Sequence, residues 1–200
     1  MGGFDSIERV SRALENLLTD ALRELGGSRP PVAQLHSLKP PPSRQPPVLS
    51  LFLYEISEDP TVRNRPEQRT VEVDAQGQTL YRTVKPPMAL LLRYLITPWA
   101  TTPETELLMI GRTMQVLYER QVRRGAELTP EPDLDAVSIT LAPLSLDERS
   151  RVWWAIQEPY KLSLNYEARV VDIDVRPESG ALHPPVRRRE FGQTVPEGTS

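Results

Sequence analysis

The sequence predicts an α/β protein of the α+β kind: a single domain with a twisted mixed sheet flanked by helices, followed by an extended C-terminal tail. Two segments, 48–56 and 88–97, are apolar at almost every position, as strands buried on both faces are. Two prolines precede each segment, which stiffens the chain there and discourages stray strand pairing. Two further segments, 5–25 and 102–125, carry apolar residues at helical spacing.

A helix is therefore predicted over residues 5–25. Its apolar residues fall on one stripe, which must pack against a sheet; they are Ile7, Val10, Leu14, Leu17, Leu18, Ala21, Leu22 and Leu25. Asp5 or Ser6 can cap its start, and the pair of glycines after Leu25 ends it. We expect a short strand at 32–36 next, and then a proline-rich connection that is extended and unpaired.

The two apolar strands are separated by a predicted hairpin. The segment 70–84 alternates in polarity and turns near Gln76 and Gly77, as β-hairpins do. It lies between the strands at 48–56 and 88–97, so it connects the two most apolar parts of the chain.

The second long helix is predicted over residues 102–125. Thr102 is placed to cap it, Pro103 occupies its first turn, and Gly125 ends it. Its apolar stripe is expected to consist of Leu107, Leu108, Ile110, Met114, Leu117 and Val122.

Three more elements complete the predicted domain. Residues 137–141 are expected to form a strand. Ser145 and Glu148 have the spacing of a capping box, which opens a short helix that continues through Ile156. A long strand is predicted over 162–173, where apolar and polar residues alternate.

The composition restricts the classes of function. With 200 residues the chain has room for one domain, which we place at 1–175, and for an extended proline- and arginine-rich tail at 176–200. The net charge of −3 gives no general attraction to nucleic acid or anionic lipid. The chain contains no cysteine, which excludes disulfides and thiolate metal sites. No segment reaches the roughly 18 apolar residues of a membrane span.

The sequence offers little that points to catalysis or to a cofactor. Its two histidines, His36 and His183, lie far apart and next to prolines or polar residues, so no metal-ligand cluster is expected. Carboxylates do occur in pairs, at Asp133/Asp135, Asp147/Glu148 and Asp172/Asp174. No polarising partner lies near any pair in sequence, so we interpret them as solvated groups. The sequence therefore predicts no cofactor and no enzyme activity.

Other side chains are candidates for contact with partners. Trp153 and Trp154 are adjacent, so on a helix they cannot share a face: one is expected in the core and the other can meet a partner. Arg187, Arg188 and Arg189 form a short basic run, interpreted as solvated or as paired with an acidic protein surface. Arg93 interrupts an apolar strand and is expected to have a structural carboxylate or carbonyl partner.

The order and spacing of several motifs resemble one known family. An "I-x-x-V-S-x-x-L" helix starting at Ile7 is followed by "PPVLSLFLYEI", "PPMALLLRYLITPWA" and "LLMIGRTMQVL". A "W…Y-x-L-S-x-x-Y" pattern from Trp154 to Tyr166 completes the series. Over residues 5–175 the chain resembles the cap, or tail-terminator, proteins of extracellular contractile injection systems of the Photorhabdus virulence cassette and antifeeding prophage type.

This resemblance implies both a fold and a role. The fold is a phage tail-terminator-like sheet flanked by helices. The implied role is structural: a homo-hexameric ring closes the distal end of the inner tube and anchors the contractile sheath, with tube and sheath subunits as partners. It also implies assembly in the bacterial cytoplasm, in a particle that is then released or retained. Longer family members carry further C-terminal domains, whose functions are not carried over here.

Two alternatives remain at this point. The chain can occupy another position in the same kind of particle, as a baseplate or sheath-adaptor subunit. A small enzyme that uses the paired carboxylates is a more distant reading, because the sequence contains no nucleophile–base or metal constellation.

The tail at 176–200 is too polar to form a core of its own. It becomes ordered when a partner surface supplies the burial that it lacks, since ordering costs roughly 1–2 kcal/mol per residue in backbone entropy. We expect the tail to lie across a neighbouring cap subunit or the sheath; the alternative is a tail that has no role. Phe191 would be its apolar anchor, and Arg187, Arg188 and Arg189 would face acidic groups.

Overall fold

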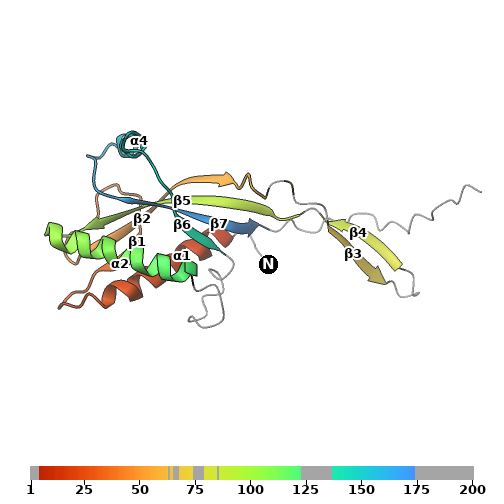
Figure 1. The fold of residues 1–200 in the computed structure, drawn as a ribbon, viewed down its shortest axis with the longest axis horizontal. Coiled ribbons are helices and arrows are strands. Elements are labelled where there is room, and N and C mark those ends of the chain that lie inside the picture. The colour runs from red at the N-terminus through yellow and green to blue at the C-terminus, as the bar shows by residue number, and fades with distance from the viewer. Residues whose placement is uncertain are drawn as a thin grey trace, which may run out of the picture. The chain divides into compact units, whose positions relative to one another are not determined.

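The computed structural model describes residues 5–62, 64, 68–73, 79–84, 86–122 and 137–173. Five strands form a mixed sheet in the order β1-β2-β5-β7-β6 (Figure 1). The strands are β1 (Val32–Leu35), β2 (Val48–Glu58), β5 (Met88–Trp99), β6 (Ser138–Leu141) and β7 (Leu164–Ile173). β1 runs parallel to β2 and the other pairs are antiparallel, which confirms the predicted mixed sheet.

Helices cover both faces of this sheet, as the sequence predicted. α1 (Ser6–Arg23) and α2 (Pro103–Val122) lie on one face, and the shorter α4 (Leu146–Ile156) lies on the other (Figure 1). Two glycines follow α1 with positive φ angles, at Gly26 and Gly27, a conformation that residues with a Cβ adopt only with strain. The predicted capping box at the start of α4 is present, with Ser145 and Glu148 bonded to each other in both directions.

The predicted hairpin is also present and is described here by itself. β3 (Gln68–Val73) and β4 (Thr79–Val84) pair antiparallel as a separate two-stranded sheet. The residues of the turn between them, Gln76 and Gly77 included, lie outside the described part of the chain.

The larger core lies between the sheet and the two long helices. The stripe predicted for α1 supplies Val10, Leu14, Leu18 and Leu22, all at most 4% exposed. These side chains pack on one face of the central strands. One buried polar contact links the layers: the hydroxyls of Ser11 in α1 and Tyr94 in β5 are 2.8 Å apart. This hydrogen bond favours one position of α1 over the sheet, because both hydroxyls are buried away from water and must bond within the protein.

A second, smaller core lies on the opposite face, under α4. It contains Leu38, Leu95, Trp99, Trp153 and Ile156. The rings of Trp99 and Trp153 pack against each other, 6.4 Å apart and tilted by 59°. As the sequence predicted, β5 is buried on both faces along almost its whole length. β2 is buried on both faces only in its first half, and Ile56 near its end is 50% exposed.

The apolar stripe expected for α2 coincides only in part with the face that the helix buries. Among the described side chains of this helix, Met109, Thr113 and Leu117 are buried, at most 1% exposed, and of these only Leu117 belonged to the expected stripe. Leu107, Leu108 and Met114, expected in the stripe, are 58%, 61% and 39% exposed, and Val122 lies outside the described side chains. The expectation was wrong for the three exposed residues because α2 carries apolar residues on more than one face, and sequence spacing alone does not tell which face meets the sheet.

Two leucines of α2 provide a matched test of this arrangement. Leu117→Ala should lower the free energy of unfolding by about 2–5 kcal/mol, because it leaves a cavity in the main core. Leu108→Ala should change it by no more than about 0.5 kcal/mol, because this side chain is mostly in solvent. Urea denaturation of both variants measures the difference, and equal losses would contradict the burial described here.

Candidate assembly surfaces

The adjacent tryptophans of α4 point in opposite directions. Trp153 is 1% exposed, and its indole N–H donates to the Ser163 hydroxyl at 3.3 Å. Trp154 is 82% exposed. Of these two candidate interface residues, Trp153 therefore belongs to the core, and Trp154 alone is available for contact with a partner.

Other exposed apolar side chains lie on α4 or follow it in the chain. Leu146 at the start of α4, and Tyr160 and Leu162 after its end, are 45–62% exposed. A hollow beside Trp154, of about 340 Å³, is lined by Trp154, Ala155, Gln157 and Glu158. An exposed tryptophan next to such a hollow is typical of a protein–protein contact, because its large ring gains much from burial. We call this region the Trp154 surface.

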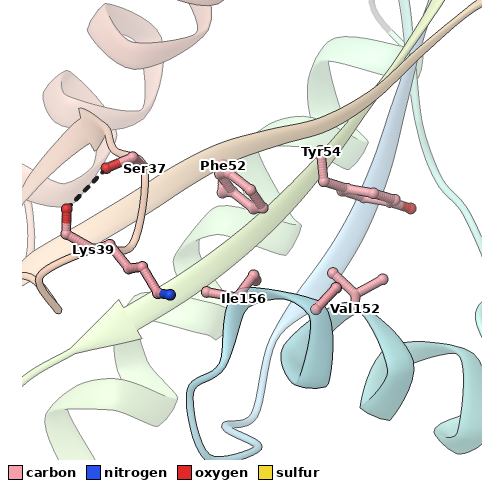
Figure 2. Close-up of a pocket in the computed structure, with 7 residues that line it drawn as sticks. Ser37, Lys39, Phe52, Tyr54, Val152 and Ile156 are labelled. Atoms are coloured by element: carbon pink, nitrogen blue, oxygen red, sulfur yellow. Dashed lines mark hydrogen bonds between the residues drawn. The ribbon is translucent and has the colours of Figure 1, made fainter.

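An apolar groove of about 300 Å³ lies between β2 and the inner side of α4 (Figure 2). Phe52 and Tyr54 of β2 face Val152 and Ile156 of α4 across it. Burial raises the pKa of Tyr54 to about 12, so the phenol keeps its proton at neutral pH and donates to the Asn165 side chain at 2.7 Å. Lys39 is the charged residue at its rim, and its ammonium donates to Gln157. The groove therefore suits an apolar side chain better than a reacting group.

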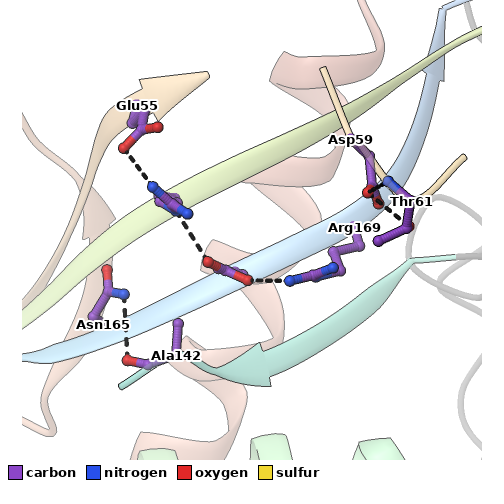
Figure 3. A network of polar contacts seen from close by, with 8 residues as sticks. Glu55, Asp59, Thr61, Ala142, Asn165 and Arg169 are labelled. Carbon is purple, nitrogen blue, oxygen red and sulfur yellow. Dashed lines mark hydrogen bonds and ion pairs between the residues drawn. The ribbon is translucent and has the colours of Figure 1, made fainter. Parts of the chain in front are cut away.

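A row of ion pairs crosses three strands on the same face of the sheet (Figure 3). Arg93 of β5 lies between Glu55 of β2 and Glu167 of β7, with nitrogen–oxygen distances of 2.8 and 3.0 Å. Arg169 binds the other oxygen of Glu167 at 2.8 Å. The prediction that Arg93 has a structural carboxylate partner is confirmed, and it has two such partners.

The charges of this row offset one another. Burial alone would raise the pKa of Glu167, but hydrogen bonds from Arg169 and Arg93 outweigh burial and hold that pKa below its usual range. The two carboxylates likewise keep the pKa of Arg93 raised despite its partial burial. Both arginines are thus committed to Glu55 and Glu167 and stabilise the sheet, and neither is presented to an anionic ligand.

The described residues contain no arrangement that suggests catalysis. No group of three or more histidine or acidic side chains among them is placed to hold a metal ion. The Nδ1 of His36 accepts a hydrogen bond from the backbone N–H of Leu38, so this ring nitrogen stabilises the local backbone. Of the carboxylate pairs, Glu148 serves the capping box and Asp147 pairs with Arg151. The other two pairs lie outside the described side chains.

None of the described helices has both the length and the apolar character needed to cross a bilayer.

The exposed side of α2 is a surface that sequence reasoning missed. Leu107, Met114 and Tyr118 are 58%, 39% and 67% exposed, and Gly111 lies between them with open space around it. Their spacing of four, three and four residues places all four on one side of the helix. That spacing was visible in the sequence, but Leu107 and Met114 had been assigned to the buried apolar stripe, and Gly111 and Tyr118 had not been considered. We call this region the α2 outer surface.

The remaining candidate residues cannot be placed. Arg187, Arg188, Arg189 and Phe191 all lie outside the described part of the chain, and their role stays a prediction.

Known proteins share this fold. The model of the Pvc16 N-terminal domain family matches residues 9–188. A solved sheath/tube terminator of the PVC extracellular contractile injection system, in its extended state, is similar with a TM-score of 0.60 and 23% identity. The cap of the anti-feeding prophage, a tube-terminating cap, is similar with a TM-score of 0.58 and 24% identity. A search of curated proteins finds no match.

The two solved chains are longer than this one. The similarity covers 97% and 90% of this chain but 64% and 59% of the two solved chains, respectively. At these identities the likeness establishes the fold that the three chains share.

The ion-pair row predicts a pH dependence of stability. A carboxylate with a lowered folded-state pKa stabilises the fold above its unfolded pKa of about 4.3, and this contribution is lost as the pH falls through the folded value. Glu167→Gln should therefore unfold more easily than the unmodified protein near neutral pH, and the gap should close as the solution is acidified.

Denaturation midpoints at a series of pH values from about 7 to about 3 measure that gap. Glu55→Gln is the control: its carboxylate is 41% exposed, against 10% for Glu167, so its gap should be smaller. A gap for Glu167→Gln that stays constant with pH would contradict this account.

Proposed function

Because the chain belongs to the Pvc16 N-terminal domain family, we propose that it is a structural cap that closes the distal end of the inner tube and contractile sheath of a contractile injection system. The observation that carries the proposal is the family match over residues 9–188. It is supported by a fold shared with a sheath/tube terminator and with a tube-terminating cap. Residues 1–175 would form the cap domain and 176–200 its tail.

The described surfaces support an assembly role. The chain exposes large apolar side chains at the Trp154 surface and at the α2 outer surface, which lie on opposite faces of the sheet. Exposed apolar side chains gathered in this way mark contacts between proteins. We infer that they serve contacts with neighbouring copies in a homo-hexameric ring and with tube and sheath subunits.

One alternative differs from this proposal in the position of the protein in the particle. A baseplate or sheath-adaptor subunit would present similar surfaces but would lie near the spike end. The fold similarity to two terminators favours the distal end. Assembly would take place in the bacterial cytoplasm, before the particle is released or retained.

Deletion of the gene tests the function directly. Particles from the deletion strain should have abnormal tube or sheath lengths or be few in number, because nothing stops polymerisation at a defined point. Electron micrographs of purified particles give the length distribution, and the complemented strain is the control. Fully contractile particles of normal length from the deletion strain would contradict the proposal, and gold-labelled copies near the spike would favour the adaptor reading.

Substitution of Trp154 tests the surface. Trp154→Ala should leave the unfolding transition unchanged and lower the occupancy of the cap in particles, since losing a tryptophan at a contact costs about 2 kcal/mol, or roughly 30-fold in affinity. Arg151→Ala is the matched control, because Arg151 lies on the same helix and its side chain is 78% exposed. Equal occupancy of the cap in particles for the two variants would show that Trp154 does not contribute to the contact.

A further inference from the structure

The two edge strands of the five-stranded sheet, β1 and β6, differ in whether their outward backbone groups are hydrogen-bonded. At β1, the backbone N–H groups that point away from the sheet are already bound by α1. The Ala33 N–H donates to the Thr19 hydroxyl at 3.0 Å, and the Leu35 N–H donates to the Glu15 carboxylate at 3.1 Å. Side chains of α1 therefore close this edge, and another strand cannot pair with it there.

At β6, the described part of the chain leaves the edge open. β6 pairs with β7 on one side, and the Ala142 N–H continues that pairing by donating to the Asn165 carbonyl at 2.9 Å. Backbone direction alternates along a strand, so Thr140 also faces β7, whereas the N–H and C=O groups of Ile139 and Leu141 point away from it. Within the described part of the chain, nothing binds these outward groups.

An apolar groove lies directly beside this open edge. Met114, Gln115, Leu117 and Tyr118 of α2 line it, with Leu141 of β6 and Tyr166 of β7, and its volume is about 310 Å³. Leu141 is 49% exposed and pairs in register with the buried Tyr166. The groove thus lies where α2 passes the end of β6. A strand added at β6 would direct every second side chain into the groove.

The open edge and the groove are independent features that meet at one place. One supplies backbone hydrogen bonds and the other supplies apolar burial, and a strand that adds to a sheet edge needs both. We propose that β6 and the α2 outer surface form an acceptor for residues 186–195 of a second copy of this chain, with Phe191 in the groove. The proposal rests on the proposed function, because the ring brings the copies together.

The tail contains a segment of suitable chemistry. Residues 186–195, bounded by Pro185 and Pro196, form the longest run of the tail without proline, and proline interrupts ladder pairing. Phe191, Gln193 and Val195 would share one face of a strand. The segment starts 13 positions after the end of β7 at Ile173, which allows a reach of up to about 45 Å, enough to leave its own subunit.

Charge also favours this segment. Arg189 would lie on the same face as Phe191, next to it along the strand. Glu119 on α2 is exposed, and its carboxylate accepts a hydrogen bond at 3.0 Å from Gln115, which lines the groove. An arginine next to the aromatic anchor would then meet an acidic group on the acceptor, which fixes the position of the strand along the edge.

Cysteine cross-linking tests the contact cleanly, because the protein contains no cysteine of its own. Two full-length chains with tags of different size carry Gln115→Cys and Gln193→Cys, changes that spare both Phe191 and the groove's apolar residues. Mixed under assembly conditions and oxidised mildly, they should form a disulfide-linked heterodimer on a non-reducing gel. The control pairs Gln193→Cys with Arg151→Cys on α4, on the other face of the sheet, and should give about tenfold less product.

The outcomes separate the possible occupants of the groove. A heterodimer above the control level, reduced about tenfold by Phe191→Ala and restored by Phe191→Leu, supports the proposal. A double variant that links only within one chain assigns the tail to its own subunit and overturns it. A link from Gln115→Cys to a sheath or tube subunit, with none to the tail, also overturns it.

A charge exchange adds a check on register. Arg189→Glu should weaken cross-linking, and Glu119→Arg in the partner chain should restore it. Particles imaged in parallel distinguish this inference from the proposed function. Correctly terminated particles with no cross-link would refute the strand contact alone, whereas particles that never carry the protein at their distal end would refute the cap function.

Discussion

Burial of the central strand β5 on both faces is the constraint that places the other elements. An apolar strand with helices on only one side would leave a whole row of large side chains in water. α1 and α2 cover one row and α4 covers the other, with Trp153 packed on Trp99. The sheet therefore divides the apolar residues into two cores, and the short α4 is as necessary to β5 as the two long helices are.

The same constraint explains where polar groups enter the sheet. On the α4 side of the sheet, Glu55, Arg93 and Glu167 lie in one row across β2, β5 and β7. Each charge is paired with its neighbour, so the row leaves none of these three charges unpaired. The hydroxyl pair of Ser11 and Tyr94 has a related effect in the main core, where it fixes one position of α1.

Much of this fold could be predicted from the sequence, because its strongest signals are local. The proline pairs, the capping box at Ser145 and the apolar strands can be recognised from residues that are adjacent in sequence, without knowing what each element packs against. The buried face of α2 was predicted only in part: Leu117 was placed correctly, but Leu107 and Met114 are as apolar as Met109, and only the tertiary contacts distinguish them. Whether each sheet edge is open or closed could not be predicted either, since the closure of β1 depends on Thr19 and Glu15 of α1 lying next to it.

A difference between the two edges matters for a protein proposed to stop polymerisation. If both edges were open, β1 of one copy could pair with β6 of the next, and strand pairing alone would set no limit to growth. With β1 closed by α1, the described part of the five-stranded sheet offers one acceptor edge, and the proposed donor comes from elsewhere in the chain. A donor and an acceptor at different places make a head-to-tail contact, which closes into a ring when the rotation between copies allows it. In such a ring each donor would fill the β6 edge of the next copy, so that edge would not be free to recruit a further subunit.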